Sequence, residues 1–253
     1  MIAAVMYREY LIRTTSMVWA FYDLFMPLTY LLLFGIGLDR AFASGVQSGG
    51  QILGYNSFFL GGVLAMAGFG IAINTAYGFF VDRENGMLYE FLTYPMTRGE
   101  FLVGKILFNS SLALVQAAIT VGLGALLLGI PLRWERAGFL LPGVVLGAAG
   151  WFFFLTTFAL RIRRNDMFNT FINVAYFLLM FGSSLFYPLE GLPLWLRSIS
   201  RANPLTWHAD VLRYLTIGLG RTDTILAESA AFILFTFLSF LAAVRTLQRG
   251  VVK

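Results

Sequence analysis

Long runs of apolar residues, separated by short polar segments, dominate the pattern along the chain. Six of these runs reach the length of a membrane-crossing helix, which needs about 20 predominantly apolar residues. They cover residues 17–38, 57–80, 101–129, 138–160, 167–187 and 228–246. The pattern predicts an all-α membrane protein with six transmembrane helices, organised as a single transmembrane domain over residues 1–253.

Residues 1–15 precede the first apolar run and differ from it in character. They mix Ile2, Leu11 and other apolar residues with Arg8, Glu9 and Arg13, and they are too short and too polar to cross a bilayer. We expect an interfacial helix along the inner membrane surface, with its arginines snorkelling towards the head groups. An unstructured start is the alternative.

Residues 81–107 form the longest charge-bearing stretch between two apolar runs, and residues 82–97 within it are predicted to form a short cytoplasmic helix. Asn85 is a suitable cap for a short helix that ends before Pro95. Leu88, Phe91 and Leu92 follow i, i+3, i+4 spacing and predict an apolar ridge on that helix. Such a ridge could insert into a groove on a partner protein, or the segment could pack on its own helix bundle.

Residues 188–220 have the pattern of two short amphipathic helices. Pro193 suits the first position of one helix, and Asn203-Pro204 reads as a cap and proline that start the second. Asp210 and Arg213 can pair at i, i+3 spacing. Because each helix is too short to cross, we expect two half-helices that dip into the outer leaflet against the fifth and sixth spans. A solvated hairpin is the alternative.

The composition and the charge distribution agree with a membrane protein. Hydrophobic residues make up 58% of the chain and charged residues 12%, whereas a soluble domain carries about 25% charged residues. Eleven of the 18 Lys and Arg residues fall on the side of the termini and of the 81–105 segment. The positive-inside rule then predicts cytoplasmic termini in the cell inner membrane. Basic residues flank apolar runs instead of forming a stripe, so no nucleic-acid partner is expected.

The residue content narrows the chemistry that the chain can perform. It has no Cys and one His, which excludes thiol catalysis and a histidine-rich metal site. Gly99 to Lys105 is one residue short of a phosphate-binding P-loop, and Ile106 stands where a P-loop has Ser or Thr. We therefore expect no ATP binding here, no catalytic residue and no cofactor or metal on this chain.

A few polar residues fall inside the apolar runs. Asp23 lies in the first run, where it either forms a hydrogen bond within the bundle or takes part in transport. Asn165, Asn169 and Asn173 repeat every four residues on one face of the fifth run, which favours either contact between helices or the lining of a path. Asp23, Asn169 and Asn173 are the candidates for a substrate path.

Two stretches carry a resemblance to a known family. The stretches "DRENGMLYEFLTYPMTRGEFLVGK" and "LFYPLEGLPLWLRSISRANPLTWHADVLRYL" are similar to segments of the permease subunits of type-2 ATP-binding-cassette (ABC) exporters, among them the daunorubicin-resistance and nodulation-factor export permeases. The first resembles the family's cytoplasmic Glu-x-Gly segment. The second resembles its Asn-Pro-Leu-Thr and Asp-x-x-Arg signature. His208 stands where the family commonly has small or apolar residues, and we attach no role to it.

The resemblance implies a function and its partners. Two permeases, either two copies of this chain or a heterodimer, would form the membrane path by alternating access. Separate ATPase subunits, which carry ATP and Mg, would dock on a coupling helix within 82–97. The implied ATPase-docking residues are Glu84, Gly86, Leu88, Glu90, Phe91 and Leu92. The half-helices within 188–220 would form an outer gate with Tyr187, Pro188, Leu192, Pro193, Trp195, Asn203 and Pro204.

The expected cargo is amphiphilic or hydrophobic, such as a drug, a lipid or a lipid-linked glycan, because the spans hold few charges and many aromatic side chains. A secondary transporter or channel without an ATPase is the alternative, but the midplane carboxylates and internal repeats of such proteins are not found. A membrane-embedded enzyme would need a nucleophile with a base, or clustered metal ligands, which the sequence lacks.

Overall fold

The computed structural model describes residues 2–15, 17–42, 44–91 and 93–250, and it is almost entirely helical. The α-helices are α1 (Ile2–Thr15), α2 (Met17–Ala41), α3 (Tyr55–Glu84), α4 (Met87–Phe91), α5 (Arg98–Leu128), α6 (Ala137–Ala159), α7 (Asn165–Phe181), α8 (Leu194–Ala202), α9 (Pro204–Ile217) and α10 (Thr222–Gly250). A 3₁₀ turn, η1 (Trp134–Arg136), precedes α6. Two short strands, β1 (Val46–Ser48) and β2 (Gln51–Leu53), form an antiparallel hairpin. The all-α membrane fold is thereby confirmed.

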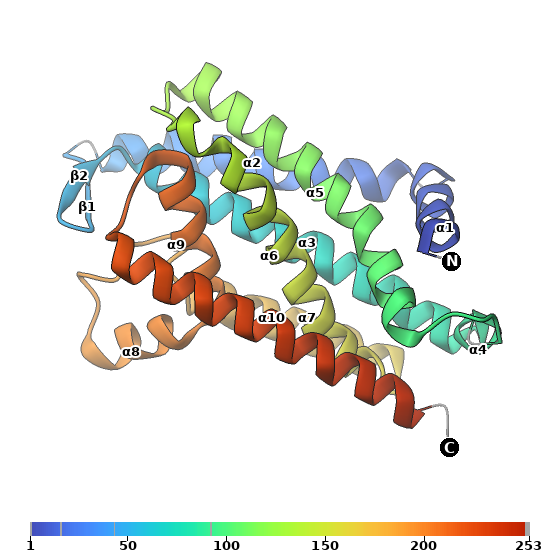
Figure 1. Ribbon diagram of the computed structural model, residues 1–253. Coiled ribbons are helices and arrows are strands. Elements are labelled where there is room, and N and C mark those ends of the chain that lie inside the picture. Colours follow the sequence, from blue (N-terminus) through green and yellow to red (C-terminus); the bar gives the residue numbers. More distant parts are fainter. Residues whose placement is uncertain (1, 16, 43, 92, 251–253) are drawn as a thin grey trace.

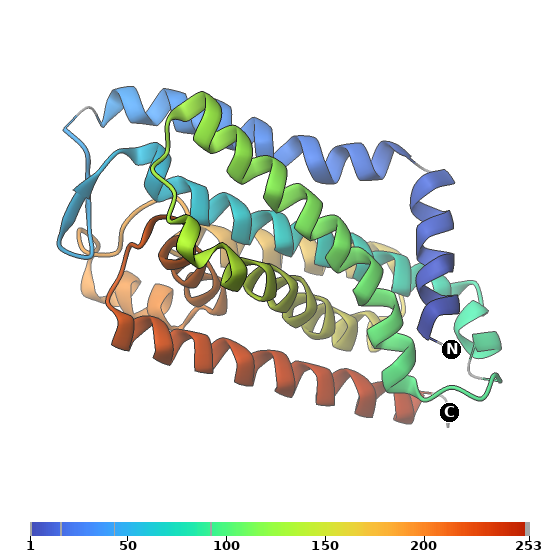
Figure 2. The same cartoon turned by 45° about the horizontal axis from the view of Figure 1, so that its top comes forward.

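The long helices run side by side between two ends of the molecule (Figures 1 and 2). One end, which we call the terminal end, holds α1, α4 and the last turns of α10. The opposite end, which we call the hairpin end, holds β1, β2 and α8. The two ends of the chain therefore lie on the same side of the bundle.

Within the described residues, five helices are long and apolar enough to cross a membrane: Phe21–Ala41, Tyr55–Glu84, Arg98–Leu128, Trp134–Ala159 and Thr222–Arg249. The predicted fifth span corresponds to α7, which has 17 residues. At 1.5 Å per residue it covers about 25 Å, less than the hydrocarbon thickness of about 30 Å. The predicted run continued to 187, but α7 ends at Phe181 with Gly182 as its C-cap, and the chain then turns irregularly. The count of six spans stays a prediction.

Helix α3 is the central element of the bundle. It packs against α2, α5, α6 and α9, and most of its residues are buried on all sides. Aromatic contacts join it to its neighbours: Phe69 lies 4.4 Å from Trp151 of α6, and Phe80 stacks on Phe168 of α7 at 4.7 Å between ring centroids. A helix that is apolar all round is expected at the centre of such a bundle.

Two local signals in the sequence explain features that the apolar pattern missed. Gly49 and Gly50 both have positive φ, 58° and 77°, and they form the two-residue turn between β1 and β2. A Gly-Gly pair between short alternating segments is a known hairpin signal. Thr97 and Glu100 form a reciprocal capping box that starts α5 at Arg98.

Helix α1 forms as predicted, but its arginines do not snorkel. Arg8 and Arg13 turn inwards and pair with Asp82 and Asp23, respectively. The face of α1 that is exposed carries Tyr7, Tyr10, Leu11 and Ile12. The expectation was wrong because buried carboxylates on α2 and α3 offer the guanidinium groups closer partners than the head groups would.

Candidate functional site

The segment predicted to form a capped helix over 82–97 is built differently. Helix α3 continues through Asp82 to Glu84, and Asn85 caps the C-terminus of α3 instead of starting a new helix. Gly86, with φ of 76°, lets the chain turn, and α4 then contributes only five residues. The predicted boundary was wrong because Asp82 and Arg83 find partners that extend α3 by a further turn.

The apolar ridge of this segment faces the chain's own bundle. Leu88 is 2% exposed, and Phe91 stacks on Phe101 of α5 with 5.4 Å between the ring centroids. Glu84, Gly86 and Glu90 are exposed, as are Met87 and Tyr94. Leu92 lies outside the described residues. Of the two alternatives that the sequence left open, the structure shows the ridge packed on the chain's own bundle. The exposed face of the segment carries both polar and apolar residues, and ATPase docking on it stays a prediction.

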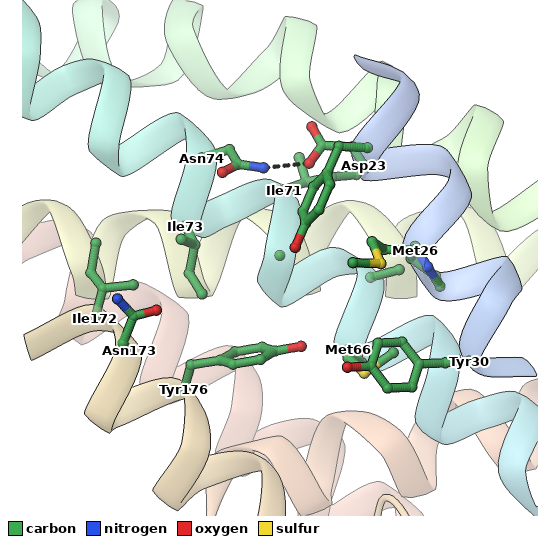
Figure 3. Close-up of a pocket in the computed structure, with 14 residues that line it drawn as sticks. Asp23, Met26, Tyr30, Met66, Ile71, Ile73, Asn74, Ile172, Asn173 and Tyr176 are labelled. Carbon is green, nitrogen blue, oxygen red and sulfur yellow. Dashed lines mark hydrogen bonds between the residues drawn. The ribbon is translucent and has the colours of Figure 1, made fainter. Parts of the chain in front are cut away.

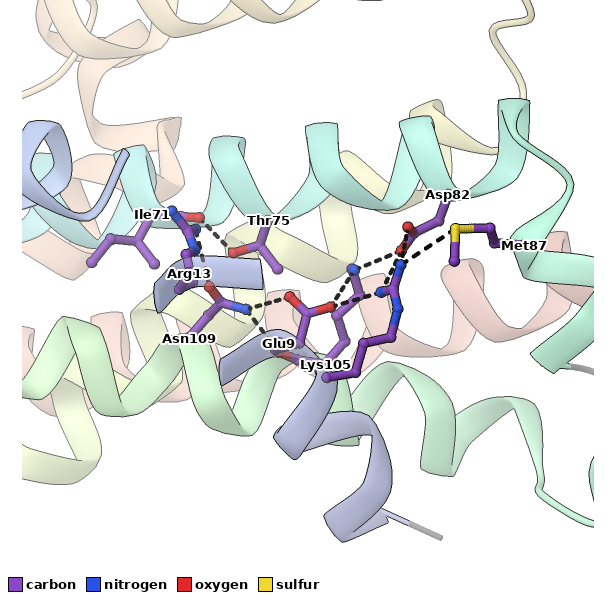
Figure 4. A network of polar contacts seen from close by, with 9 residues as sticks. Glu9, Arg13, Ile71, Thr75, Asp82, Met87, Lys105 and Asn109 are labelled. Carbon is purple, nitrogen blue, oxygen red and sulfur yellow. Dashed lines mark hydrogen bonds and ion pairs between the residues drawn. The ribbon is translucent and has the colours of Figure 1, made fainter. Parts of the chain in front are cut away.

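The near-P-loop lysine lies at the centre of a buried ionic network (Figure 4). Gly99 to Lys105 belongs to one continuous helix, so its backbone does not form a phosphate-binding loop. Lys105 is 1% exposed, and its ammonium group donates to Glu9 Oε1 at 2.6 Å and to Asp82 Oδ2 at 2.9 Å. This lysine ties α1, α3 and α5 together.

Arg8 connects this network to α4. Its guanidinium donates to Asp82 at 2.5 and 3.1 Å and contacts Glu9 at 3.3 Å. The same group donates to Met87 Sδ at 3.7 Å and lies over the Phe91 ring, 5.0 Å from its centroid. Arg8 is therefore in contact with both α4 and the carboxylates of the network.

At its other side the network reaches Asp23 of α2. Arg13 donates to Asp23 Oδ2 at 2.9 Å and to Asn109 Oδ1 at 3.0 Å, while Asn109 donates to Glu9 Oε2 at 3.3 Å. The second oxygen of Asp23 accepts a hydrogen bond from Asn74 of α3. The hydrogen bond predicted for Asp23 within the bundle is confirmed. The charges balance, because Arg8, Arg13 and Lys105 face Glu9, Asp23 and Asp82.

A cavity of about 280 Å³ opens where this network ends (Figure 3). It lies between α2, α3 and α7, and Asp23 and Asn173 both line it. Asn169 does not line it; its side chain donates to Asn165 at 2.7 Å and its carbonyl accepts from Asn173 at 2.8 Å. The three amides thus bond along α7, and no hydrogen bond from them to another helix is found in the described chain. Two of the three substrate-path candidates meet at one cavity.

Helix α9, the second of the two predicted short helices, starts as predicted. The Asn203 side chain accepts from Leu205 N–H at 2.9 Å, and Pro204 occupies the first turn of α9. In α8, Pro193 precedes the first helical residue instead of being it. Helix α9 packs on α3, α6 and α10. The expected contact with the fifth predicted span, residues 167–187, is made by hydrogen bonds. Asn203 donates to the carbonyls of Leu179 and Gly182, and Ser184 N–H donates to Thr206 Oγ1 of α9 at 3.1 Å.

The gate residues predicted around α8 lie at the surface of the hairpin end. Trp195 is 66% exposed, and Leu192, Tyr187 and Pro188 are half-buried. The Tyr187 hydroxyl donates to the backbone carbonyl of Phe181. The exposed apolar face of α8, which includes Leu194, Trp195 and Ile199, is available to lipid or to another chain.

Arg213 of α9 anchors the hairpin end, with more partners than the sequence predicted. Its pair with Asp210 is confirmed at 2.5 Å. The guanidinium also donates to three backbone carbonyls, those of Phe58 at 2.8 Å, Ser184 at 2.6 Å and Leu185 at 3.1 Å. Its side chain occupies the space that a Cβ at Gly61 of α3 would need. A glycine at position 61 is visible in the sequence, but only the structure shows that it makes room for the Arg213 side chain.

His208 of α9 is 2% exposed and is held by packing. Its ring stacks on Phe232 of α10, with 4.9 Å between centroids and an interplanar angle of 13°. The other side of the ring fits against Gly147 of α6, where a Cβ would collide with it. Gly147 of the Gly143-x₃-Gly147 pattern therefore makes room for this imidazole, whereas Gly143 lies against Leu212 and Leu215 of α9.

Comparisons with known proteins identify the family. The sequence profile of the ABC-2 type transporter matches residues 2–217. A putative transport permease ycf38 from Cyanophora paradoxa is 30% identical, over 75% of this chain and 64% of the relative. The daunorubicin resistance ABC transporter permease protein DrrB1 from Streptomyces coeruleorubidus is 27% identical, over 82% of this chain and 73% of its own.

A third relative is the probable multidrug ABC transporter permease YbhR from Escherichia coli, at 27% identity over 64% of this chain and 44% of that protein. The match thus spans less than two thirds of the length of ycf38 and of YbhR. The family profile, in contrast, covers most of this chain and includes the α4 segment, α8 and α9. With its membrane-spanning helices, the chain belongs to the ABC-2 type transporter permeases.

Proposed function

We propose that this permease is the membrane subunit of an ATP-driven exporter that moves an amphiphilic or hydrophobic cargo out of the cell. Two permease chains would form the path and alternate in access. Separate ATPase subunits, carrying ATP and Mg, would supply the energy. The terminal end would face the cytoplasm from the inner membrane, in line with the distribution of Lys and Arg residues.

The observation that carries this proposal is the continuous polar network between α4 and the cavity. It passes from Met87 and Phe91 to Arg8, and through Asp82, Lys105, Glu9, Asn109 and Arg13 to Asp23. Buried ion pairs resist separation, because an unpaired charge in an apolar environment is costly. A push on α4 would therefore shift α1 and α2 together.

The proposed docking surface is the exposed face of the α4 segment. Glu84, Glu90 and Tyr94 are exposed there and available to an ATPase, while Leu88 and Phe91 fix the position of α4 on the bundle. Exposed polar and aromatic residues on a connecting segment suit a contact between subunits.

The proposed path uses the cavity and the apolar faces beside it. Helices α2 and α7 expose Phe21, Phe25, Phe177 and Leu178, and these faces suit lipid or a second permease chain. The cavity between the two helices contains Tyr and Met side chains that can enclose an apolar body. The hairpin end, with Tyr187, Leu192 and Trp195, would then act as the outer gate.

Transport by the reconstituted complex tests the proposal. Proteoliposomes with the permease and its ATPase should move a lipophilic drug or a lipid-linked glycan only when ATP is supplied. Replacing Glu90 by Arg together with Tyr94 by Ala should reduce co-purification of the ATPase, whereas replacing Glu135 by Arg at the hairpin end should not. Transport driven by an ion gradient without the ATPase would instead support a secondary transporter.

A further inference from the structure

The cavity between α2, α3 and α7 has an uneven distribution of charge. Its lining includes one carboxylate, Asp23, and none of the residues that the structure places along its wall is Lys or Arg. Three tyrosines line it as well, and Tyr30 and Tyr176 project into it from opposite walls in Figure 3. Aromatic faces and a carboxylate both attract a positive charge.

Asp23 divides its two oxygens between two structural roles. Oδ1 accepts from Asn74, which itself lines the cavity, and Oδ2 accepts from Arg13 of α1 at 2.9 Å. Arg13 is not among the lining residues, so it neutralises Asp23 from behind the cavity wall. The carboxylate is thus in contact with both the cavity and the ionic network.

We propose that this cavity binds an organic ammonium cation, whose charge competes with Arg13 for Asp23. The inference deepens the proposed function by naming the class of cargo that the path accepts. Burying an anion beside Asp23 would bring two negative charges together, which is costly in an apolar environment. A cation gains the carboxylate together with the faces of Tyr22, Tyr30 and Tyr176.

Arg13 has an alternative arrangement when a cation occupies Asp23. Its second contact, Asn109 Oδ1 of α5, lies at 3.0 Å in this structure, and Glu9 lies four residues earlier on the same side of α1. Glu9 already holds Lys105 and reaches Asn109, so Arg13 can move towards an existing negative centre. Binding of the cation would in this way reach Arg8 and α4 through the same network.

A matched pair of soluble probes tests the inference on the purified permease, without the ATPase. Benzyltrimethylammonium and phenylmethanesulfonate share a benzyl group and a similar size, but they carry opposite charges. Equilibrium dialysis against permease in phosphatidylcholine nanodiscs should detect saturable binding of the cation and none of the anion. Saturation-transfer NMR should place the aromatic ring of the bound cation against tyrosine side chains.

Variants of the ion pair separate this role from a purely structural one. Arg13→Gln removes the competitor, and we expect it to raise the affinity for the cation by about tenfold. Arg13→Gln combined with Asp23→Asn removes both charges without leaving one unpaired, and it should abolish cation binding. Asp166→Asn, which removes an exposed carboxylate of α7, is the matched control and should leave binding unchanged.

The inference fails if the cation and the anion bind alike, if neither binds, or if Arg13→Gln fails to strengthen binding in a folded protein. It also fails if the double variant retains binding. These outcomes do not depend on export, because no ATP or ATPase is present. ATP-driven transport of uncharged lipids only, with no cation binding, would overturn this inference and leave the proposed function standing.

Discussion

The two ends of the molecule bury their charges in different ways. At the terminal end, six charged side chains from α1, α2, α3 and α5 pair mainly with one another. At the hairpin end, the single guanidinium of Arg213 takes one carboxylate and three backbone carbonyls.

The difference concerns what each cluster can do when the protein moves. Asp82 contacts both Arg8 and Lys105, and Glu9 does the same, so one pair can break while the other persists. The backbone carbonyls of Phe58, Ser184 and Leu185 cannot exchange partners in this way, because each is fixed in the backbone and bonded to Arg213. The first cluster suits transmission of movement, and the second suits a fixed anchor for α9.

The largest effect is expected at Arg213. Arg213→Gln should destabilise the fold by about 5 kcal/mol, at the upper end for a broken buried ion pair, because carbonyls and a carboxylate lose their partner together. Adding Asp210→Asn should restore little of the loss. Thermal unfolding in detergent measures the effect, with Arg221→Gln as an exposed control. Full recovery in the double variant would contradict the role of the carbonyls.

A smaller effect is expected at Lys105. Lys105→Met should cost about 3 kcal/mol, because Arg8 still contacts both carboxylates. Here a second substitution, Glu9→Gln, should recover most of the melting temperature, since it restores the charge balance. If the two ends responded alike to their second substitutions, the comparison would be wrong.

Photolabelling with a nucleotide analogue should leave the permease chain unlabelled in every variant.

The next smaller loss of stability is expected where α9 meets α6. Gly147→Ala places a methyl group into the His208 ring and should cost about 1–3 kcal/mol. Combining it with His208→Ala should give a smaller loss than the sum of the two single variants, because the methyl group then has room. Gly138→Ala, at a position of α6 with open space, is the control. Additive losses would show that the two residues do not compete for space.

The smallest effect on stability is expected at Trp195. This exposed side chain of α8 should be replaceable by Ala within about 0.5 kcal/mol, because most of it lies at the surface and little packing is lost. Under the proposed gate, the same variant should change the transport rate while ATPase co-purification stays constant. Ser198→Ala on the same helix is the control. An unchanged transport rate would argue against a role for α8 in the gate.

Local patterns predicted many elements correctly for physical reasons. The apolar runs correspond to α2, α3, α5, α6, α7 and α10, since a helix in lipid must bond its own backbone and be apolar over its length. Asn203-Pro204 starts α9, and Asp210 pairs with Arg213, because caps and i, i+3 pairs act within one or two turns.

Predictions about what a helix face packs against were less successful. Spacing correctly grouped Leu88 and Phe91, but it could not tell whether their face meets α5 or a partner. It likewise placed Asp23 and Asn173 in spans without bringing them to one cavity. The shortening of the fifth predicted span to α7 depended on contacts of Gly182 and Asn203 that lie far apart in the sequence.

The sequence by itself determined that the chain enters a membrane as helices, because apolar length and backbone hydrogen bonding are local requirements. It also determined where α9 begins and which residues share a face. Only the tertiary structure decided the partners of each charge: Lys105 with Glu9 and Asp82, and Arg213 with carbonyls of another segment. Pairing depends on distance in space, and residues nearly 100 positions apart become neighbours only when the helices pack.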